Sequence, residues 1–263
     1  MTDDAGELVR YELDGHVATI TYNRPQRLNA IDGAMRTEIN AAFARFRDDE
    51  AAWVGIVTGA GRAFCAGADL RSETGSPVGE FAGTFWEKPT VNSFESGWEI
   101  YKPVIAAVNG HCIGYGLTLV TWCDFVLASD QATFAFPEVT VGIPTIVGAL
   151  RLPQRIGWHH AMELLLTGER IDAARAQEIG LAGKIVPHED LMAEARSLAD
   201  RLCKAAPLAA RATKEMAIRG ADLSMAEAIR FGETMRKVVQ ATDDAAEGMA
   251  AAAERREPRW QGR

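Results

Sequence analysis

The sequence lacks a hydrophobic stretch long enough to cross a membrane. No uncharged apolar run in the 263 residues approaches the roughly 20 that a membrane span requires. Residues 1–10 carry three acids and no apolar leader segment. We therefore expect a cytoplasmic protein.

Cysteines are few, and positive charge is not in excess. The four cysteines form no C-x-x-C pair and have no histidine partner at metal-ligand spacing, so we expect no metal site. We expect reduced, mostly buried thiols at Cys65, Cys112, Cys123 and Cys203.

The formal net charge of -8 argues against nucleic acid or an anionic membrane as the main partner, since both attract a basic surface.

Complete nucleotide-binding and serine-hydrolase motifs are missing as well. Glycine pairs at 59–61 and 114–116 each begin a dinucleotide fingerprint, but Phe64 and Leu119 stand where the third glycine is needed. There is no G-x-x-x-x-G-K-[ST] loop and no G-x-S-x-G motif. If both turns follow strands of one core, their backbone N–H groups could instead converge on one carbonyl oxygen and form an oxyanion hole.

Strand and helix patterns alternate in the first half of the chain. Asp14-Gly15 is typical of a tight turn and predicts a hairpin of residues 8–13 and 16–22. One amphipathic helix and three buried strands are expected at 32–48, 53–58, 104–108 and 124–128. Four helices are expected near the C-terminus, at 190–203, 207–219, 224–240 and 242–253. These patterns predict a layered α/β core followed by a helical region.

Four motifs, in a fixed order, resemble the crotonase superfamily of enoyl-CoA hydratases and isomerases. They are AFCAGADL at 63–70, KPVIAAVNGHCIGYGLTLVTWCDFVLAS at 102–129, ATFAFPEVTVGIP at 132–144 and LRLPQRIG at 150–157. The resemblance covers nearly the whole chain. It implies an α/β spiral of ββα units in residues 1–195, which would contain the pocket for CoA and the acyl group. It also implies a helical region in residues 196–263 that assembles a homotrimer or a dimer of trimers.

The resemblance also implies the residues of an active site. The substrate would be a CoA thioester, with no separate cofactor. The N–H groups of Ala68 and Tyr115 would hold the thioester oxygen as an enolate forms, and Glu138 would move the proton. Further substrate contacts are implied for Ala66, Asp69, Leu70, Arg24, Arg27, Thr118 and Arg255, the last reaching CoA in a neighbouring subunit.

The chain departs from the hydratase pattern at Thr118. Hydratases of this superfamily place a glutamate there and a second at the position of Glu138. A threonine hydroxyl can orient water but is too weak an acid or base to replace a carboxyl group. Hydration or dehydration, double-bond isomerisation and a non-catalytic CoA-binding role therefore stay open. The residues Thr145, Ile146 and Val147 predict a reshaped acyl pocket, whose acyl group the sequence does not identify.

Residues 71–101 mix glycines with aromatic residues and show no clear period. We interpret them as a lid or pocket wall, or as a loop and helix packed on the core. Their glutamates are candidates for a second acid or are solvated charges: Glu80, Glu87, Glu95 and Glu99.

Overall fold

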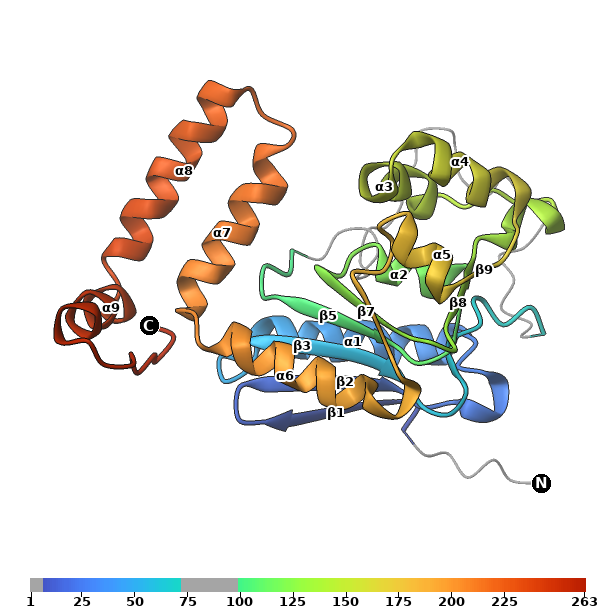
Figure 1. The fold of residues 1–263 in the computed structure, drawn as a ribbon, viewed down its shortest axis with the longest axis horizontal. Coiled ribbons are helices and arrows are strands. Elements are labelled where there is room, and N and C mark those ends of the chain that lie inside the picture. The colour runs from blue at the N-terminus through green and yellow to red at the C-terminus, as the bar shows by residue number, and fades with distance from the viewer. Residues whose placement is uncertain (1–6, 72–98) are drawn as a thin grey trace.

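Two sheets form the core of the computed structural model, which describes residues 7–71 and 99–263 (Figure 1). The larger sheet has the order β1-β2-β3-β5-β7-β10, with bounds Val9–Asp14, Val17–Tyr22, Val54–Gly59, Val104–Val108, Phe125–Ser129 and Lys184–Val186. The smaller sheet has the order β4-β6-β8-β9, with bounds Ala63–Cys65, His111–Ile113, Thr133–Ala135 and Ile171–Asp172.

The first two strands form the predicted hairpin. β1 and β2 pair antiparallel, and Gly15 supplies the positive φ of 58° that their tight turn requires. Beyond β2 every neighbouring pair in the larger sheet is parallel. Its strands are correspondingly apolar on both faces, as buried parallel strands are.

Consecutive strands alternate between the two sheets. β3, β5 and β7 belong to the larger sheet, and β4, β6 and β8, which follow them directly in the chain, belong to the smaller one. Each pair of consecutive strands, such as β3 and β4, therefore adds one strand to each of the two sheets. This repeated ββ step, followed by helices, is the spiral that the sequence predicts.

Helices cover both faces of the larger sheet (Figure 1). α1 (Gly33–Asp48) packs Phe43 and Phe46 into one apolar cluster, and α6 (Leu191–Cys203) packs Ala195 and Ala199 into another. α1 begins where predicted, because the Asp32 carboxylate accepts the Met35 N–H at 2.9 Å. The predicted boundary between residues 195 and 196 falls inside α6.

The remaining helices divide into two groups. The first group comprises the short helices α2 (Tyr115–Val120), α3 (Val147–Ile156), α4 (Trp158–Thr167) and α5 (Ala173–Glu178) and the 3-10 turns η1 (Pro25–Arg27), η2 (Pro137–Val141) and η3 (His188–Asp190). Of these, α2 and α5 contact strands of the smaller sheet, α3 packs on α2 and α4, and η3 contacts α6. The C-terminal helices α7 (Pro207–Gly220), α8 (Met225–Gln240) and α9 (Asp243–Glu254) project from the core (Figure 1). The capping box of Ser224 and Glu227 at the start of α8 is present as predicted.

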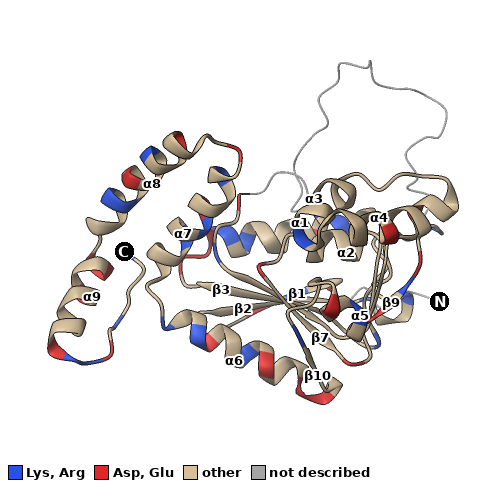
Figure 2. Ribbon diagram, turned by 45° about the horizontal axis from the view of Figure 1, so that its top comes forward, with Lys and Arg blue, Asp and Glu red and all other residues tan. Residues whose placement is uncertain are grey.

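Charges of both signs are interspersed on α6 and α8 (Figure 2). Three of the four cysteines are buried, and all four are free thiols. None of the helices within residues 7–71 and 99–263 is long and apolar enough to span a membrane. In the same ranges no cluster of histidine, cysteine or acidic side chains could hold a metal ion.

Candidate active site

The turns that carry Ala68 and Tyr115, which the family resemblance implies as oxyanion donors, lie against each other at Gly67 and Gly114. Gly67 has a φ of 92° and Gly114 a φ of 54°. A Cβ atom at position 114 would lie 3.8 Å from the Cα of Gly67, and a Cβ at position 67 would lie 3.2 Å from the carbonyl oxygen of Ile113. Glycine is therefore needed at both positions for its backbone freedom and for the close approach of the two turns.

The first turn points one N–H group away from the core. Ile31 donates to the carbonyl oxygen of Gly67 at 2.8 Å, and Asp69 donates to the carbonyl oxygen of Ile31 at 3.0 Å. Because backbone groups alternate sides along such a bridge, the N–H of Ala68 faces the opposite direction. Ala68 is exposed. Its N–H is therefore open to a substrate.

The second turn starts α2. Tyr115 is the first residue of this helix, where an N–H has no acceptor within the helix. The next residue, Gly116, packs on β4 so closely that a Cβ atom there would lie 2.7 Å from the Cβ of Cys65. This contact ties the start of α2 to the strand that leads into the first turn. Thr118 follows one helical turn later and is buried.

Glu138 reaches the same place from η2. A Cβ atom at position 114 would lie 2.9 Å from its Oε1. Its Oε2 is buried and has no hydrogen-bond partner among the described residues. Burial raises the pKa of the carboxyl group, and a hydrogen bond from its own backbone N–H partly opposes that shift. A half-buried carboxyl group thus lies beside the residue that precedes Tyr115.

A groove of about 510 Å³ adjoins the first turn. It lies between η1 and residues 68–71, and its arginines are Arg27, Arg62 and Arg71. Ala68 and the exposed side chain of Leu70 also line it. A groove with several cations and an open backbone N–H group suits an anionic ligand.

Arg24 is not among the residues that line this groove. Its guanidinium group bonds Asp69 at 2.8 Å, Asp32 at 3.0 Å and the carbonyl oxygen of Ala30 at 2.9 Å. Asp69 also accepts the N–H of Arg71 at 3.1 Å, as expected of a residue that braces its own turn. The bond from Arg24 holds the pKa of the Asp69 carboxyl group below its ordinary value.

Comparisons with known proteins show the family of this chain. The sequence family described as enoyl-CoA hydratase/isomerase matches residues 12–263. The chain belongs to the enoyl-CoA hydratase/isomerase family. It is 40% identical to carnitinyl-CoA dehydratase of Proteus mirabilis, over 95% of this chain and 96% of that protein. It is 35% identical to (E)-benzylidenesuccinyl-CoA hydratase of Thauera aromatica, over 97% of this chain and 99% of that protein.

A solved structure shows the same fold. The crystal structure of an enoyl-CoA hydratase/isomerase from Mycobacterium paratuberculosis superposes with a TM-score of 0.85 at 40% sequence identity, covering 97% of this chain and 99% of that one. This member of the family is therefore an enzyme of the hydratase/isomerase type, with the α/β fold that its sequence predicts.

The other predicted site residues differ in their distance from the two turns. Ala66 donates its N–H to the carbonyl oxygen of Leu28 at 3.0 Å, which ties the first turn to η1. Arg255 ends α9 in the projecting C-terminal part, away from both turns within one chain (Figure 1). Glu99 bonds Arg219 of α7 at 2.9 Å in an exposed ion pair. The other three glutamates of the predicted lid lie outside the described residues.

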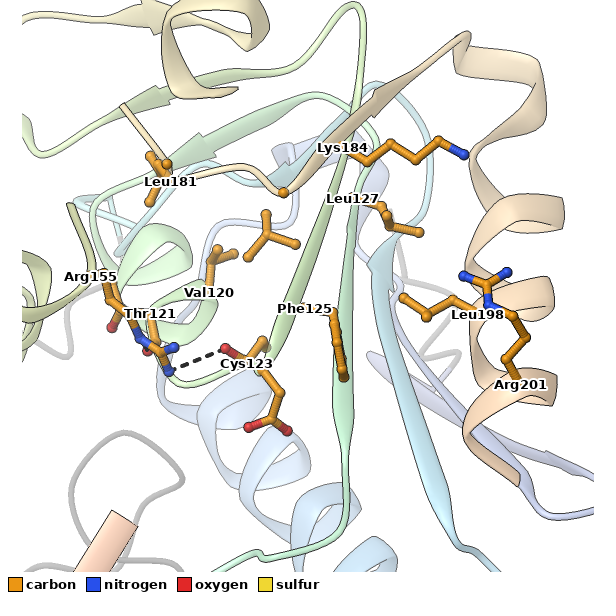
Figure 3. A pocket seen from close by; sticks show the side chains of 14 residues that line it. Val120, Thr121, Cys123, Phe125, Leu127, Arg155, Leu181, Lys184, Leu198 and Arg201 are labelled. Atoms are coloured by element: carbon orange, nitrogen blue, oxygen red, sulfur yellow. Dashed lines mark hydrogen bonds between the residues drawn. The ribbon is translucent and has the colours of Figure 1, made fainter. Parts of the chain in front are cut away.

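A second cavity, of about 330 Å³, lies at the far end of α2 (Figure 3). Its apolar lining includes Phe125, Leu127 and Leu198, and Arg155 at its edge donates to the carbonyl oxygen of Cys123 at 3.3 Å. Val120 and Thr121 line it, whereas Tyr115, five residues earlier, starts the helix at the glycine turns. This cavity is separate from the candidate active site.

Proposed function

We propose that this enzyme adds water reversibly to an enoyl-CoA thioester. The N–H groups of Ala68 and Tyr115 hold the thioester oxygen, and Glu138 transfers the proton. The observation that carries the proposal is the contact of the Glu138 carboxylate with Gly114, the residue before Tyr115. This contact supports a role for Glu138 as the acid/base beside the two proposed donors.

One carboxylate can serve both proton transfers. Glu138 takes a proton from water as the water oxygen bonds to C3 of the enoyl group, and the electron pair of the double bond moves to the thioester oxygen. Ala68 and Tyr115 stabilise the resulting enolate. When the enolate collapses, C2 takes the proton from Glu138. The buried Thr118 hydroxyl orients the water without exchanging a proton.

Double-bond isomerisation is the second candidate. It is favoured by the threonine at position 118, where hydratases resembling this chain carry a first glutamate. Glu138 would then remove a proton at C2 and return it at C4, and no water would take part. Relatives named as hydratases and a dehydratase favour the first candidate.

The remaining contacts follow from the charges of the site. The phosphates of CoA would lie along the groove with Arg27, and the main chain of residues 66–70 would border the rest of the nucleotide. Arg255 would reach CoA in a neighbouring subunit of a homotrimer or a dimer of trimers. No separate cofactor is needed, because CoA is part of the substrate.

The experiment incubates the wild type and Glu138→Gln with enoyl-, 3-hydroxyacyl- and 3-enoyl-CoA thioesters and follows them by mass and ultraviolet absorbance. Addition of water changes the mass of the thioester, whereas isomerisation leaves the mass unchanged and alters only its ultraviolet absorbance. We expect Glu138→Gln to lower kcat by about 100-fold or more, because an amide keeps the shape but carries no proton. Glu99→Gln, which alters an exposed glutamate in an ion pair with α7, is the matched control.

The pH profile gives an independent readout. Burial raises the pKa of Glu138, and a base must be ionised to act. The wild-type kcat/KM should therefore fall toward acid pH through a pKa above that of an exposed glutamate. A turnover rate that Glu138→Gln leaves unchanged would disprove the role of Glu138.

A further inference from the structure

We propose that Arg24 is a positioning residue, which sets the place and the electrostatic surroundings of the Ala68 N–H and does not bind the substrate. The inference rests on the proposed function, because it assigns Ala68 as an oxyanion donor. It also gives Arg24 a different task from the CoA contact that the resemblance implies.

Arg24 joins three segments that together hold the first turn. It bonds Asp69 beside Ala68, Asp32 at the start of α1, and the carbonyl oxygen of Ala30. The side chains of Arg24, Asp69 and Asp32 are only 15%, 9% and 19% exposed. Ion pairs that are this shielded are screened far less than surface pairs.

The backbone of Arg24 is fixed as firmly as its side chain. Its N–H donates to Oδ1 of Asn29 at 2.8 Å. Asn29 is fully buried, and its Nδ2 donates to the carbonyl oxygens of Ala60 and Ala63 at 3.0 and 2.7 Å. Arg24 is therefore anchored to the link between β3 and β4, and its guanidinium group is held on Asp69, which lines the groove, while Arg24 itself is not among the lining residues.

The charge of Arg24 also matters for the enolate. Asp69 directly follows Ala68, whose N–H would hold the oxygen on which negative charge develops, and both residues line the same groove. An unneutralised carboxylate there would oppose that charge, and Arg24 cancels it. A lysine carries its three N–H donors on a single nitrogen, whereas Arg24 bonds Asp32 and Asp69 through two different nitrogens of a planar group, so lysine would reproduce these bonds only in part.

The test compares Arg24→Met, Arg24→Lys, Asp69→Asn and the double variant Arg24→Met/Asp69→Asn. Arg27→Met serves as the comparison for a cation in the groove. Arg10→Met is the matched control, because Arg10 bonds the side chain of Asn23 in an exposed contact apart from the groove. The readouts are kcat and KM, together with the pKa of a bound 3-ketoacyl-CoA, followed by the ultraviolet absorbance of its enolate.

We expect Arg24→Met to lower kcat by roughly tenfold or more with a small change in KM, and to raise the pKa of the bound 3-ketoacyl-CoA. Arg24→Lys should be intermediate. The double variant should recover part of the loss in kcat, because it removes the unpaired carboxylate together with the arginine. Arg27→Met should instead raise KM.

A rise in KM at unchanged kcat in Arg24→Met would overturn the inference, since Arg24 would then be a substrate ligand. An unaltered enolate pKa in both Arg24→Met and Arg24→Lys would overturn it too. If Arg24→Met does not fold, Arg24→Lys and the double variant decide the question by the same readouts. Failure of the proposed function is distinguishable, because the wild type itself would then neither turn over a thioester nor form the enolate of the bound 3-ketoacyl-CoA.

Discussion

At the scale of single residues, Gly114 carries two requirements at once. Its φ of 54° is one that a residue with a side chain rarely adopts. Its missing Cβ leaves the space that Oε1 of Glu138 occupies. The backbone turn and the acid/base therefore share a single position, and a substitution there should affect both.

Gly114→Ala should lose most of its turnover and also some stability. The methyl group would displace the Glu138 carboxylate, and the left-handed backbone conformation would cost about 1 kcal/mol. Gly15→Ala is the matched control, because Gly15 has a φ of 58° and no atom within 4 Å of the position of its Cβ. Thermal melts and steady-state rates check both variants. Equal rates in the two variants would contradict the contact with Glu138.

The sequence predicts some of these residues and not others. AFCAGADL and FPEV identify Ala68 and Glu138 as candidates through their resemblance to a family. In the structure, Gly114 contacts both Gly67, the residue before Ala68, and the carboxylate of Glu138. The partners of Arg24 could not be predicted, because Asp69 is 45 residues away in sequence and nothing local links the two. The residue type alone suggests a phosphate ligand equally well.

At the scale of elements, the C-terminal end of α1 is held by a buried lysine. Lys102 is 3% exposed and donates to the carbonyl oxygens of Phe46 and Asp49 at 2.7 and 2.6 Å. These are carbonyl groups that a helix end cannot satisfy itself. Because Lys102 lies two residues before β5, these hydrogen bonds hold the end of α1 against the beginning of that strand. Burial lowers the pKa of this lysine to about 8.

Lys102→Met should destabilise the fold by about 2 kcal/mol or more, because the buried carbonyl group of Phe46 loses its donor, and that of Asp49, which also accepts the N–H of Ala52 at 3.1 Å, loses its charged one. Lys184→Met is the control. Lys184 forms an exposed ion pair with Glu194, and loss of such a pair costs at most about 1 kcal/mol. Urea unfolding measures both variants. If the two midpoints shift equally, Lys102 does not hold α1 in the way that we describe.

Element boundaries are predicted well where a local chemical signal marks them. Asp32, Ser224 and Thr242 cap α1, α8 and α9, and each helix begins at the residue after its cap. The smaller sheet is not predicted, because its strands are only two or three residues long and show no period. They form only because neighbours such as Cys65 and Cys112 meet through the tertiary fold.

At the scale of the whole molecule, the spiral follows from repetition. The parallel strands β3, β5 and β7 of the larger sheet are each followed by a strand of the smaller one, so the carboxyl ends of β3 and β5 lead into the turns that carry Ala68 and Tyr115. Composition and periodicity predict only a layered α/β core. The spiral order comes from the family resemblance, since the pairing of strands distant in sequence leaves no mark in local patterns.

The C-terminal helices leave apolar surface uncovered in a single chain. No residue of α8 is buried. Met225 is 77% exposed and Ile229 is 58% exposed, and Met249 of α9 is similarly open to solvent. A row of large apolar side chains on projecting helices is typical of a surface that another subunit covers. We therefore expect the chain to assemble through α8 and α9.

The double variant Met225→Glu/Ile229→Glu should shift the protein from oligomer toward monomer, because two carboxylates would be desolvated in the interface. Thr234→Glu adds one carboxylate at an exposed polar position of α8 and is the control for negative charge on this helix. Light scattering after size-exclusion chromatography, over a range of concentrations, measures the mass. Activity per subunit should fall when the oligomer dissociates, since Arg255 would no longer reach a neighbouring CoA site. A wild type that is monomeric and fully active would refute both the interface and this role of Arg255.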